Sequence, residues 1–334
     1  MKYYSLVGFL LGGPACILAA VLLATPVLAN PRKEVRLPDA VLVAEVKLHY
    51  DRFILVSRGT PPMPGLDEAQ VLVMSGAGDR KSVHLPGRDV PGIYSFIIRD
   101  AAGSPSGRLA VSGSAWDVHG RAAAMLVIYS QGNPPLIVRT HPLMCNKTAF
   151  DADDQLWCLA SDIEKFNARS TDYNLVAKFS PSGVLLGQYL PRADFPVSAV
   201  RFAFKAPESD GRHPAGDARI YAGRGCVDVW LPNVSTAIRL GADGTEQSRR
   251  PIEPTDTNGL AFDSECRASR IERQPETRNY RILRLTEQGW SPPGASTPEN
   301  LIGGHELLAV QGNEAVVWNF RNLLAYYLPL TSDR

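Results

Sequence analysis

The segments NKTAFDADDQLWCL, from Asn146 to Leu159, and NGLAFDSECRASRI, from Asn258 to Ile271, share the pattern Asn-x-x-Ala-Phe-Asp at a separation of 112 residues. Each segment has an apolar run, a turn rich in Asp or Ser, and a second run, which is typical of two antiparallel strands. The separation equals two units of 56 residues, and a period of this size indicates a repeat architecture.

A second motif recurs along the chain. It consists of an apolar strand, a small or hydroxyl residue, two further residues, and then Gly or Asn before the next strand. The copies are VLVMSGAG, LVIYSQGN, VAKFSPSG, AIRLGADG and RILRLTEQG, which end at Gly78, Asn133, Gly183, Gly244 and Gly289. The successive spacings are 55, 50, 61 and 45 residues. Gly or Asn at the last turn position suits a tight hairpin, which often needs a positive φ there.

The two motifs together predict an all-β fold, a six-bladed β-propeller over residues 40–330. Six segments qualify as inner strands with their turns: His49–Ser57, Phe96–Gly113, the two Asn motifs, SAVRFAF from Ser198, and Glu306–Phe320. Six inner strands and five outer hairpins fit six blades of about 45 to 60 residues. An α/β fold would need crossover helices, and no long period of 3.6 residues follows Asn30.

The last unit offers three strands, Glu306–Val310, Glu314–Asn319 and Leu323–Leu328, where a blade needs four. Lys33–Leu37, within residues 30–39, is left unassigned. Because an open sheet edge is a liability, we predict that this segment pairs with the last blade and closes the ring. The alternative is that residues 30–39 form a flexible linker.

The N-terminus predicts export. Lys2 precedes an apolar run from Leu6 to Leu23, and Val27-Leu28-Ala29 supplies the small residues of a cleavage site, so residues 1–29 read as a signal peptide. The alternative is an uncleaved membrane anchor formed by residues 5–29, since the run is long enough to span a bilayer. We therefore expect a secreted or periplasmic protein, which contacts a membrane only if that segment is retained.

Four cysteines follow the signal, an even number that permits two disulfides in an exported chain. Cys145 and Cys158 flank one hairpin, and we predict a disulfide between them. Cys226 and Cys266 lie in successive units and are less favoured as partners.

Composition excludes some functions. The chain has 35 basic and 34 acidic residues, and removal of Lys2 with the signal leaves 34 of each, so we expect no nucleic-acid partner. GxSxG, HExxH and phosphate-loop motifs are absent from the sequence, and its six histidines lack metal-ligand spacing. We expect a monomer without a cofactor.

The aspartates of FDADDQLW are interpreted as turn-formers rather than calcium ligands, and Trp116, Trp157, Trp230 and Trp318 as packing between blades.

The candidate binding residues are polar groups at or near the start of inner strands: Asn146, Ser198, Asn258 and His305. Equal register in successive blades would place them around one mouth of the channel. The sequence thus favours an exported binding module for a small molecule, a glycan or a protein. The alternative is that each asparagine bonds its own turn.

Asn258-Gly259-Leu260-Ala261-Phe262 resembles the blade-start segment of gluconolactonase-like six-bladed propellers and of NHL-repeat proteins. The resemblance implies that Asn258, and Asn146 at the equivalent register, hold a divalent metal, usually calcium. It thereby adds a second hypothesis, a metal-dependent lactonase-like hydrolase. Lys147 stands where the family has an acidic residue after the asparagine.

Overall fold

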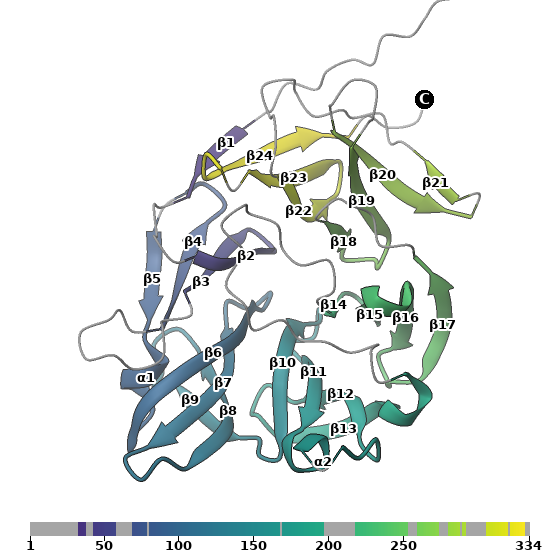
Figure 1. Cartoon of the computed structure of the whole chain (residues 1–334). Coiled ribbons are helices and arrows are strands. Elements are labelled where there is room, and N and C mark those ends of the chain that lie inside the picture. Colours follow the sequence, from purple (N-terminus) through teal and green to yellow (C-terminus); the bar gives the residue numbers. More distant parts are fainter. Residues whose placement is uncertain are drawn as a thin grey trace, which may run out of the picture.

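The computed structural model describes residues 33–37, 43–57, 69–78, 80–167, 169–196, 218–252, 259–273, 280–287, 289–291, 305–319 and 321–330. These residues form six four-stranded antiparallel sheets. The sheets stand around a central axis, with one edge of each sheet facing the centre (Figure 1). The prediction of an all-β, six-bladed propeller is confirmed.

Blades 1 to 5 each contain four consecutive strands, ordered from the innermost strand to the outermost. Blade 1 comprises β2 (Val43–His49), β3 (Arg52–Ser57), β4 (Gln70–Ser75) and β5 (Arg80–His84). Blade 2 comprises β6 (Ile93–Gly103), β7 (Leu109–Asp117), β8 (Ala122–Tyr129) and β9 (Leu136–Arg139). Blade 3 comprises β10 (Leu143–Phe150), β11 (Leu156–Asp162), β12 (Asn174–Phe179) and β13 (Leu185–Pro191).

Blade 4 comprises β14 (Arg219–Ala222), β15 (Cys226–Leu231), β16 (Thr236–Gly241) and β17 (Glu246–Pro251). Blade 5 comprises β18 (Leu260–Phe262), β19 (Ala268–Arg273), β20 (Tyr280–Thr286) and β21 (Gly289–Ser291). Short helices occupy some connections: α1 (Pro86–Asp89), α2 (Ile163–Asn167), η1 (Arg192–Asp194) and η3 (Pro232–Val234). Among the described residues, no helix is long and apolar enough to cross a membrane.

Blade 6 combines the two ends of the described chain. Its inner strands are β22 (His305–Gln311), β23 (Glu314–Asn319) and β24 (Leu324–Pro329), and its outermost strand is β1 (Lys33–Arg36). β1 pairs antiparallel with β24, with Val35 opposite Ala325. Val35 and Leu37 are buried in the apolar cluster between blades 6 and 1. The segment therefore closes the ring, as the sequence predicted, and leaves β24 paired on both sides.

The outer hairpin motif marks the turn between the third and fourth strands of blades 1 to 5. Its glycines have positive φ at Gly78, Gly183, Gly244 and Gly289. In blade 2 the positive φ belongs to Gly132 and not to the expected Asn133. The turn is thus set by the residue that lacks a Cβ, which adopts this conformation at no steric cost.

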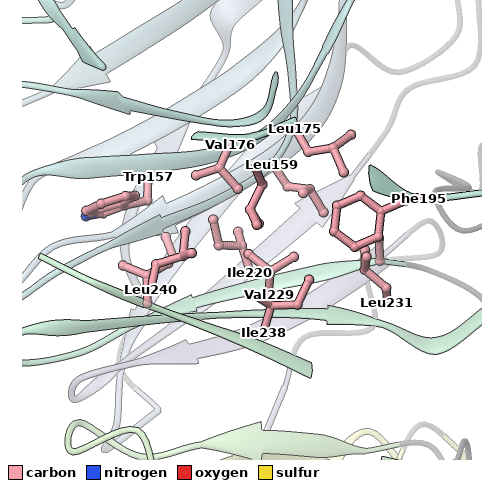
Figure 2. Close-up of a cluster of buried hydrophobic side chains, with 14 residues drawn as sticks. Trp157, Leu159, Leu175, Val176, Phe195, Ile220, Val229, Leu231, Ile238 and Leu240 are labelled. Carbon is pink, nitrogen blue, oxygen red and sulfur yellow. The ribbon is translucent and has the colours of Figure 1, made fainter. Parts of the chain in front are cut away.

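Six apolar clusters lie between adjacent blades, one at each junction. At the junction of blades 3 and 4, Trp157, Leu159 and Val176 face Ile220, Val229 and Ile238 (Figure 2). Trp157 is fully buried and its Nε1 donates to Asp151 Oδ2 at 2.8 Å. Packing of sheet faces against each other, and not a single central core, therefore holds the ring together.

The first turn of a blade, which joins its first and second strands, is capped by aspartate in the two copies of the Asn motif. Asp151 accepts the backbone N–H groups of Asp153 and Gln155, and Asp263 those of Glu265 and Arg267. This is the turn-forming role that the sequence indicated for the FDADDQLW aspartates.

Both pairs of cysteines form disulfides. Cys145 on β10 bonds to Cys158 on β11, with a Cα–Cα separation of 5.3 Å. Cys226 bonds to Cys266 at a Cα–Cα separation of 6.3 Å, although the sequence disfavoured this pair. That expectation was wrong because Cys226 begins the second strand of blade 4 and Cys266 lies in the first turn of blade 5, and these positions meet at the junction between the blades.

Two inner strands differ from their predicted positions. The inner strand of blade 4 is β14, which begins at Arg219, whereas Ser198 and the SAVRFAF segment lie outside the described residues. In blade 1 the inner strand β2 ends at His49, and the left-handed Tyr50 (φ 57°) turns the chain into β3, the second strand. The apolar run of HYDRFILVS therefore forms the second strand of its blade.

Candidate ligand-binding site in the central channel

A cavity of about 660 Å³ occupies the channel. Its walls come from the inner strands of blades 1, 3, 4, 5 and 6, and the first turns of the blades contribute to its lining. The lining mixes apolar side chains with charged ones, notably Glu45, Lys47, Lys147, Arg219 and Glu306. A volume of this size is in the usual range for small-molecule sites, about 300 to 1,000 Å³.

Two ion pairs cross the channel, and each skips one blade. Lys147 of β10 places its Nζ 3.1 Å from both carboxylate oxygens of Glu45 on β2, so it bypasses blade 2. Arg219 of β14 donates to Glu306 of β22 at 3.0 Å and bypasses blade 5. The first pair therefore links blade 3 to blade 1, and the second links blade 4 to blade 6, at the wall of the cavity.

A third ion pair lies beside them and is more deeply buried. Lys47 Nζ donates to both oxygens of Asp100, at 2.6 Å, and Asp100 is fully buried on β6. The Thr148 backbone N–H and hydroxyl also donate to Asp100, at 2.6 and 2.8 Å. Asp100 thus neutralises Lys47 and fixes β10 against β6.

Contacts between first turns fix the cavity rim. Gln311 donates through its side-chain amide to the Tyr50 carbonyl, which links blades 6 and 1. Arg52 donates to the Ser104 carbonyl, which links blades 1 and 2. The Ser106 N–H donates to Asp154 of blade 3 at 3.3 Å. The Arg224 N–H donates to the Ser264 carbonyl at 2.8 Å and links blades 4 and 5, so among the described residues such hydrogen bonds connect the rim at four of the six junctions.

Burial favours the neutral form of two lining groups. Burial, assisted by the cations of Lys47 and Arg52, lowers the pKa of His49 to about 3. Burial also raises the pKa of Tyr221, and Arg219 and Lys147 oppose this increase. A neutral imidazole both donates and accepts hydrogen bonds, as does a phenol, so these groups add polar chemistry to the cavity without adding charge.

One wall is aromatic. The rings of Tyr221 and Phe262 have centroids 4.9 Å apart, and both residues line the cavity together with Phe150. Tyr221 donates its hydroxyl hydrogen to the Leu260 carbonyl of the next blade. This wall therefore offers an apolar surface close to the charged groups.

The four residues predicted from sequence do not line this cavity as a set. Asn146 is 4% exposed at a β-bulge in β10, and its amide donates to the Met144 carbonyl and the Ser161 hydroxyl. His305 is the first residue of β22, opposite Asn319. Ser198 and Asn258 lie outside the described residues. The cavity instead takes the sequence neighbours of Asn146 and His305, namely Lys147 and Glu306.

The sequence could not show that Lys147 and Glu306, and not Asn146 and His305, line the cavity. Alternation along a strand indicates that a residue beside an inward-facing one points away, so the choice of Asn146 over Lys147 depends on the register. The bulge between Cys145 and Lys147 shifts that register. The sequence feature that could have identified the lining residues is the presence of charged residues on otherwise apolar inner strands.

Within the part of the chain that the structure describes, no three His, Cys, Asp or Glu side chains gather closely enough to hold a metal ion.

No protein-family model and no curated protein matches the chain. Solved structures do match, at low identity. A protein of unknown function from Bacteroides caccae is 10% identical, with a TM-score of 0.44, 81% of this chain and 83% of that chain covered. Virginiamycin B lyase from Staphylococcus aureus is 10% identical, with a TM-score of 0.45, and the match covers 89% of this chain and 98% of the lyase. A GH43 β-xylosidase/α-arabinofuranosidase from a compost microbial metagenome is 12% identical, with a TM-score of 0.43, and the match covers 79% of this chain and 98% of that enzyme.

Proposed function

We propose that this protein is an exported binding module that takes a small polar molecule into the cavity of its central channel. The observation that carries the proposal is the lining of the cavity by paired, largely buried charges from blades 1, 3, 4 and 6. Removal of charges from water is costly, and apolar residues of similar volume often stabilise a fold as well or better. Charges retained around a cavity therefore favour recognition of a ligand over a purely structural role.

The chemistry of the lining supports a ligand of small-molecule size. Apolar contributions from Leu48, Phe150 and Phe262 lie beside convergent donors and acceptors, which is the usual composition of such sites. Contacts between turns hold much of the rim, so the site is largely formed before binding, and this reduces the entropy lost on association. A glycan end could use the same aromatic wall, whereas a protein partner would need a larger surface.

The metal-dependent hydrolase is the second sequence hypothesis, and the contacts of Asn146 favour it less. That hypothesis needs the amide oxygen of Asn146 to face a metal in the channel. Asn146 is not among the residues that line the cavity, its amide nitrogen donates to Met144 and Ser161, and the adjacent cavity-lining residue is the cation Lys147. A cation at this position repels a divalent metal.

The test is a thermal-shift screen of purified protein with amino acids, monosaccharides, nucleosides and carboxylic acids, followed by calorimetric titration. Ala152 lies exposed in the first turn of blade 3 and lines the cavity, so Ala152→Trp narrows its mouth. Val118 is 75% exposed in the turn between β7 and β8, outside the lining, and Val118→Trp is the matched control.

We expect at least one class of molecule to raise the melting temperature saturably, by mass action on the folded state. The shift should disappear in Ala152→Trp and persist in Val118→Trp. A screen without any saturable shift would overturn the proposal, and so would a shift that survives in Ala152→Trp.

A further inference from the structure

The two ion pairs of the cavity wall form a layer deep in the channel. Their members lie on inner strands, and the first turns that follow these strands form the rim; the pairs are Glu45 with Lys147, at 3.1 Å, and Arg219 with Glu306, at 3.0 Å. A strand rises about 3.3 Å per residue, so the distance along β2 from Glu45 to His49, close to the rim, is about 13 Å. A ligand that enters from the rim therefore passes another layer of the wall before it reaches these charges.

Each charge in the deep layer is matched by direct contact. Lys47 donates to both oxygens of Asp100 at 2.6 Å and lies 3.8 Å from Glu45. Together with the two pairs above, three cations contact three carboxylates, so the layer has no net charge. An ion that entered the cavity would lose its water without gaining an unmatched opposite charge, and removal of an ion from water is costly. The layer therefore favours an uncharged ligand.

Nearer the rim, blades 4 and 5 provide an aromatic wall. Tyr221 lies two residues beyond Arg219 on β14, which is about 7 Å closer to the rim along the strand. Its ring centroid lies 4.9 Å from that of Phe262, the last residue of β18. The Tyr221 hydroxyl donates to the Leu260 carbonyl, so the two rings form an apolar surface whose polar atom is already bonded.

His49 lines the cavity from blade 1, which lies opposite blade 4 in the ring of six (Figure 1). Its side chain is partly exposed, and no residue in the described part of the chain forms a hydrogen bond with its ring nitrogens. Burial, with the cations of Lys47 and Arg52, lowers its pKa to about 3, so the imidazole is neutral near pH 7 and has one donor and one acceptor. A polar group inside a protein normally has a partner, and here a ligand in the cavity can supply it.

We infer that the ligand is an uncharged aromatic molecule that packs against Tyr221 and Phe262 and forms a hydrogen bond with the His49 imidazole. This inference rests on the proposed function and narrows its small polar molecule to one chemical class. An aromatic amide meets both requirements, because its ring is apolar and its polar group both donates and accepts hydrogen bonds without a charge.

The experiment titrates the full mature protein calorimetrically with sets of probes that share one ring and differ in charge. The first set is benzamide, benzoate and benzamidine, and the second and third are the amide, carboxylate and amidine of naphthalene and of indole. Monosaccharides are titrated in parallel. We expect at least one amide to bind, and the carboxylate and amidinium of the same ring to bind about tenfold more weakly or worse, since each is desolvated without a counter-charge.

His49→Phe tests the hydrogen bond and keeps an aromatic ring at this position. It should weaken the bound amide about tenfold and should not weaken the hydrocarbon of the same ring, which has no polar group to lose a partner. His119→Phe is the matched control, since His119 is exposed in the turn between β7 and β8, outside the lining. A melting curve of each variant checks that the fold is retained, and the contrast between amide and hydrocarbon would not arise from a disturbed fold.

Binding of a carboxylate or amidinium as tightly as its amide would overturn the inference. Titrations in which no amide binds would do so too, as would equal affinity of His49→Phe and His119→Phe for the amide. If monosaccharides or charged probes bind instead and Ala152→Trp abolishes that binding, the proposed function stands and the inference of an uncharged aromatic ligand fails. If Ala152→Trp abolishes no binding, both fail.

Discussion

Lys147 of blade 3 bonds Glu45 of blade 1 across the channel, with both carboxylate oxygens 3.1 Å from its Nζ and the two side chains only 10% and 19% exposed. The pair bypasses blade 2, so it connects elements about one hundred residues apart that share no sheet. Burial of either charge without the other is costly, so a variant that removes one partner should have a lower free energy of unfolding.

Lys147→Met should therefore destabilise the protein by about 1.5 to 3 kcal/mol, because the carboxylate of Glu45 loses its nearest cation and keeps only the longer contact with Lys47, at 3.8 Å. The double variant Lys147→Met, Glu45→Gln should recover part of the loss. Arg121→Ala is the control, since Arg121 is an exposed partner of Asp117 and its removal should cost about 1 kcal/mol or less. Urea unfolding measures all three, and equal losses for Lys147→Met and Arg121→Ala would contradict the prediction.

The closing strand makes the ring depend on residues at the N-terminal end of the described chain. A chain that starts at Ala40 lacks β1, its ladder with β24 and the buried side chains of Val35 and Leu37. We expect a loss of several kcal/mol, about 1.5 to 3 for each buried aliphatic side chain plus the ladder bonds. A melting curve of this chain, compared with one that starts at Asn30, measures the loss.

A pair of point variants in the same strand tests the contribution of its buried side chain, since neither substitution removes a backbone hydrogen bond to β24. Val35→Lys should destabilise strongly, because it places a charge in the apolar cluster between blades 6 and 1. Glu34→Lys in the neighbouring exposed position should change stability little. If both variants melt as the wild type does, the segment is a tether only.

The two disulfides should contribute unequally. Cys226–Cys266 closes a separation of 40 residues and joins blades 4 and 5, whereas Cys145–Cys158 closes 13 residues within blade 3. On the chain-entropy model, loops of these lengths give about 4 and about 3 kcal/mol. Replacing each pair by alanine, with peptide mapping under non-reducing conditions to verify the remaining bond, should show a larger loss for the inter-blade pair. A larger loss from Cys145–Cys158 would contradict this ranking.

The repeat revealed the fold because its strongest marks are local. A glycine with positive φ between two apolar runs requires the same hairpin wherever it occurs, and the copies at Gly183 and Gly244 show this directly. The closing strand also followed from the sequence, since a blade with three strands needs a fourth. Pairing of Cys226 with Cys266 could not be inferred in this way, because it depends on how two blades meet.

The candidate site was harder to predict for the same reason. Asn146 and Lys147 are adjacent, and only the bulge at this point of β10 decides which of them faces the channel. Pairing of Lys147 with Glu45 and of Arg219 with Glu306 depends on the geometry of the closed ring. A local motif does not indicate which other blade a side chain reaches in the closed ring.

Acid should weaken the fold through His49. Its pKa falls from the ordinary 6.5 to about 3, chiefly because burial disfavours the imidazolium. Between these values the unfolded chain binds a proton that the folded protein does not, so stability rises with pH through this window and is lost as pH falls from about 6.5 toward 3.

His49→Gln keeps a neutral polar side chain and removes this proton. Between pH 7 and pH 5 the wild type should lose about 2 kcal/mol more than His49→Gln, since pH 5 lies about 1.5 units below the unfolded pKa and each unit corresponds to about 1.4 kcal/mol. Denaturant unfolding of both proteins at several pH values from 4 to 8 gives the difference directly, and other titrating groups cancel in it. Parallel stability profiles would show that the His49 imidazole is protonated as readily in the folded channel as in the unfolded chain.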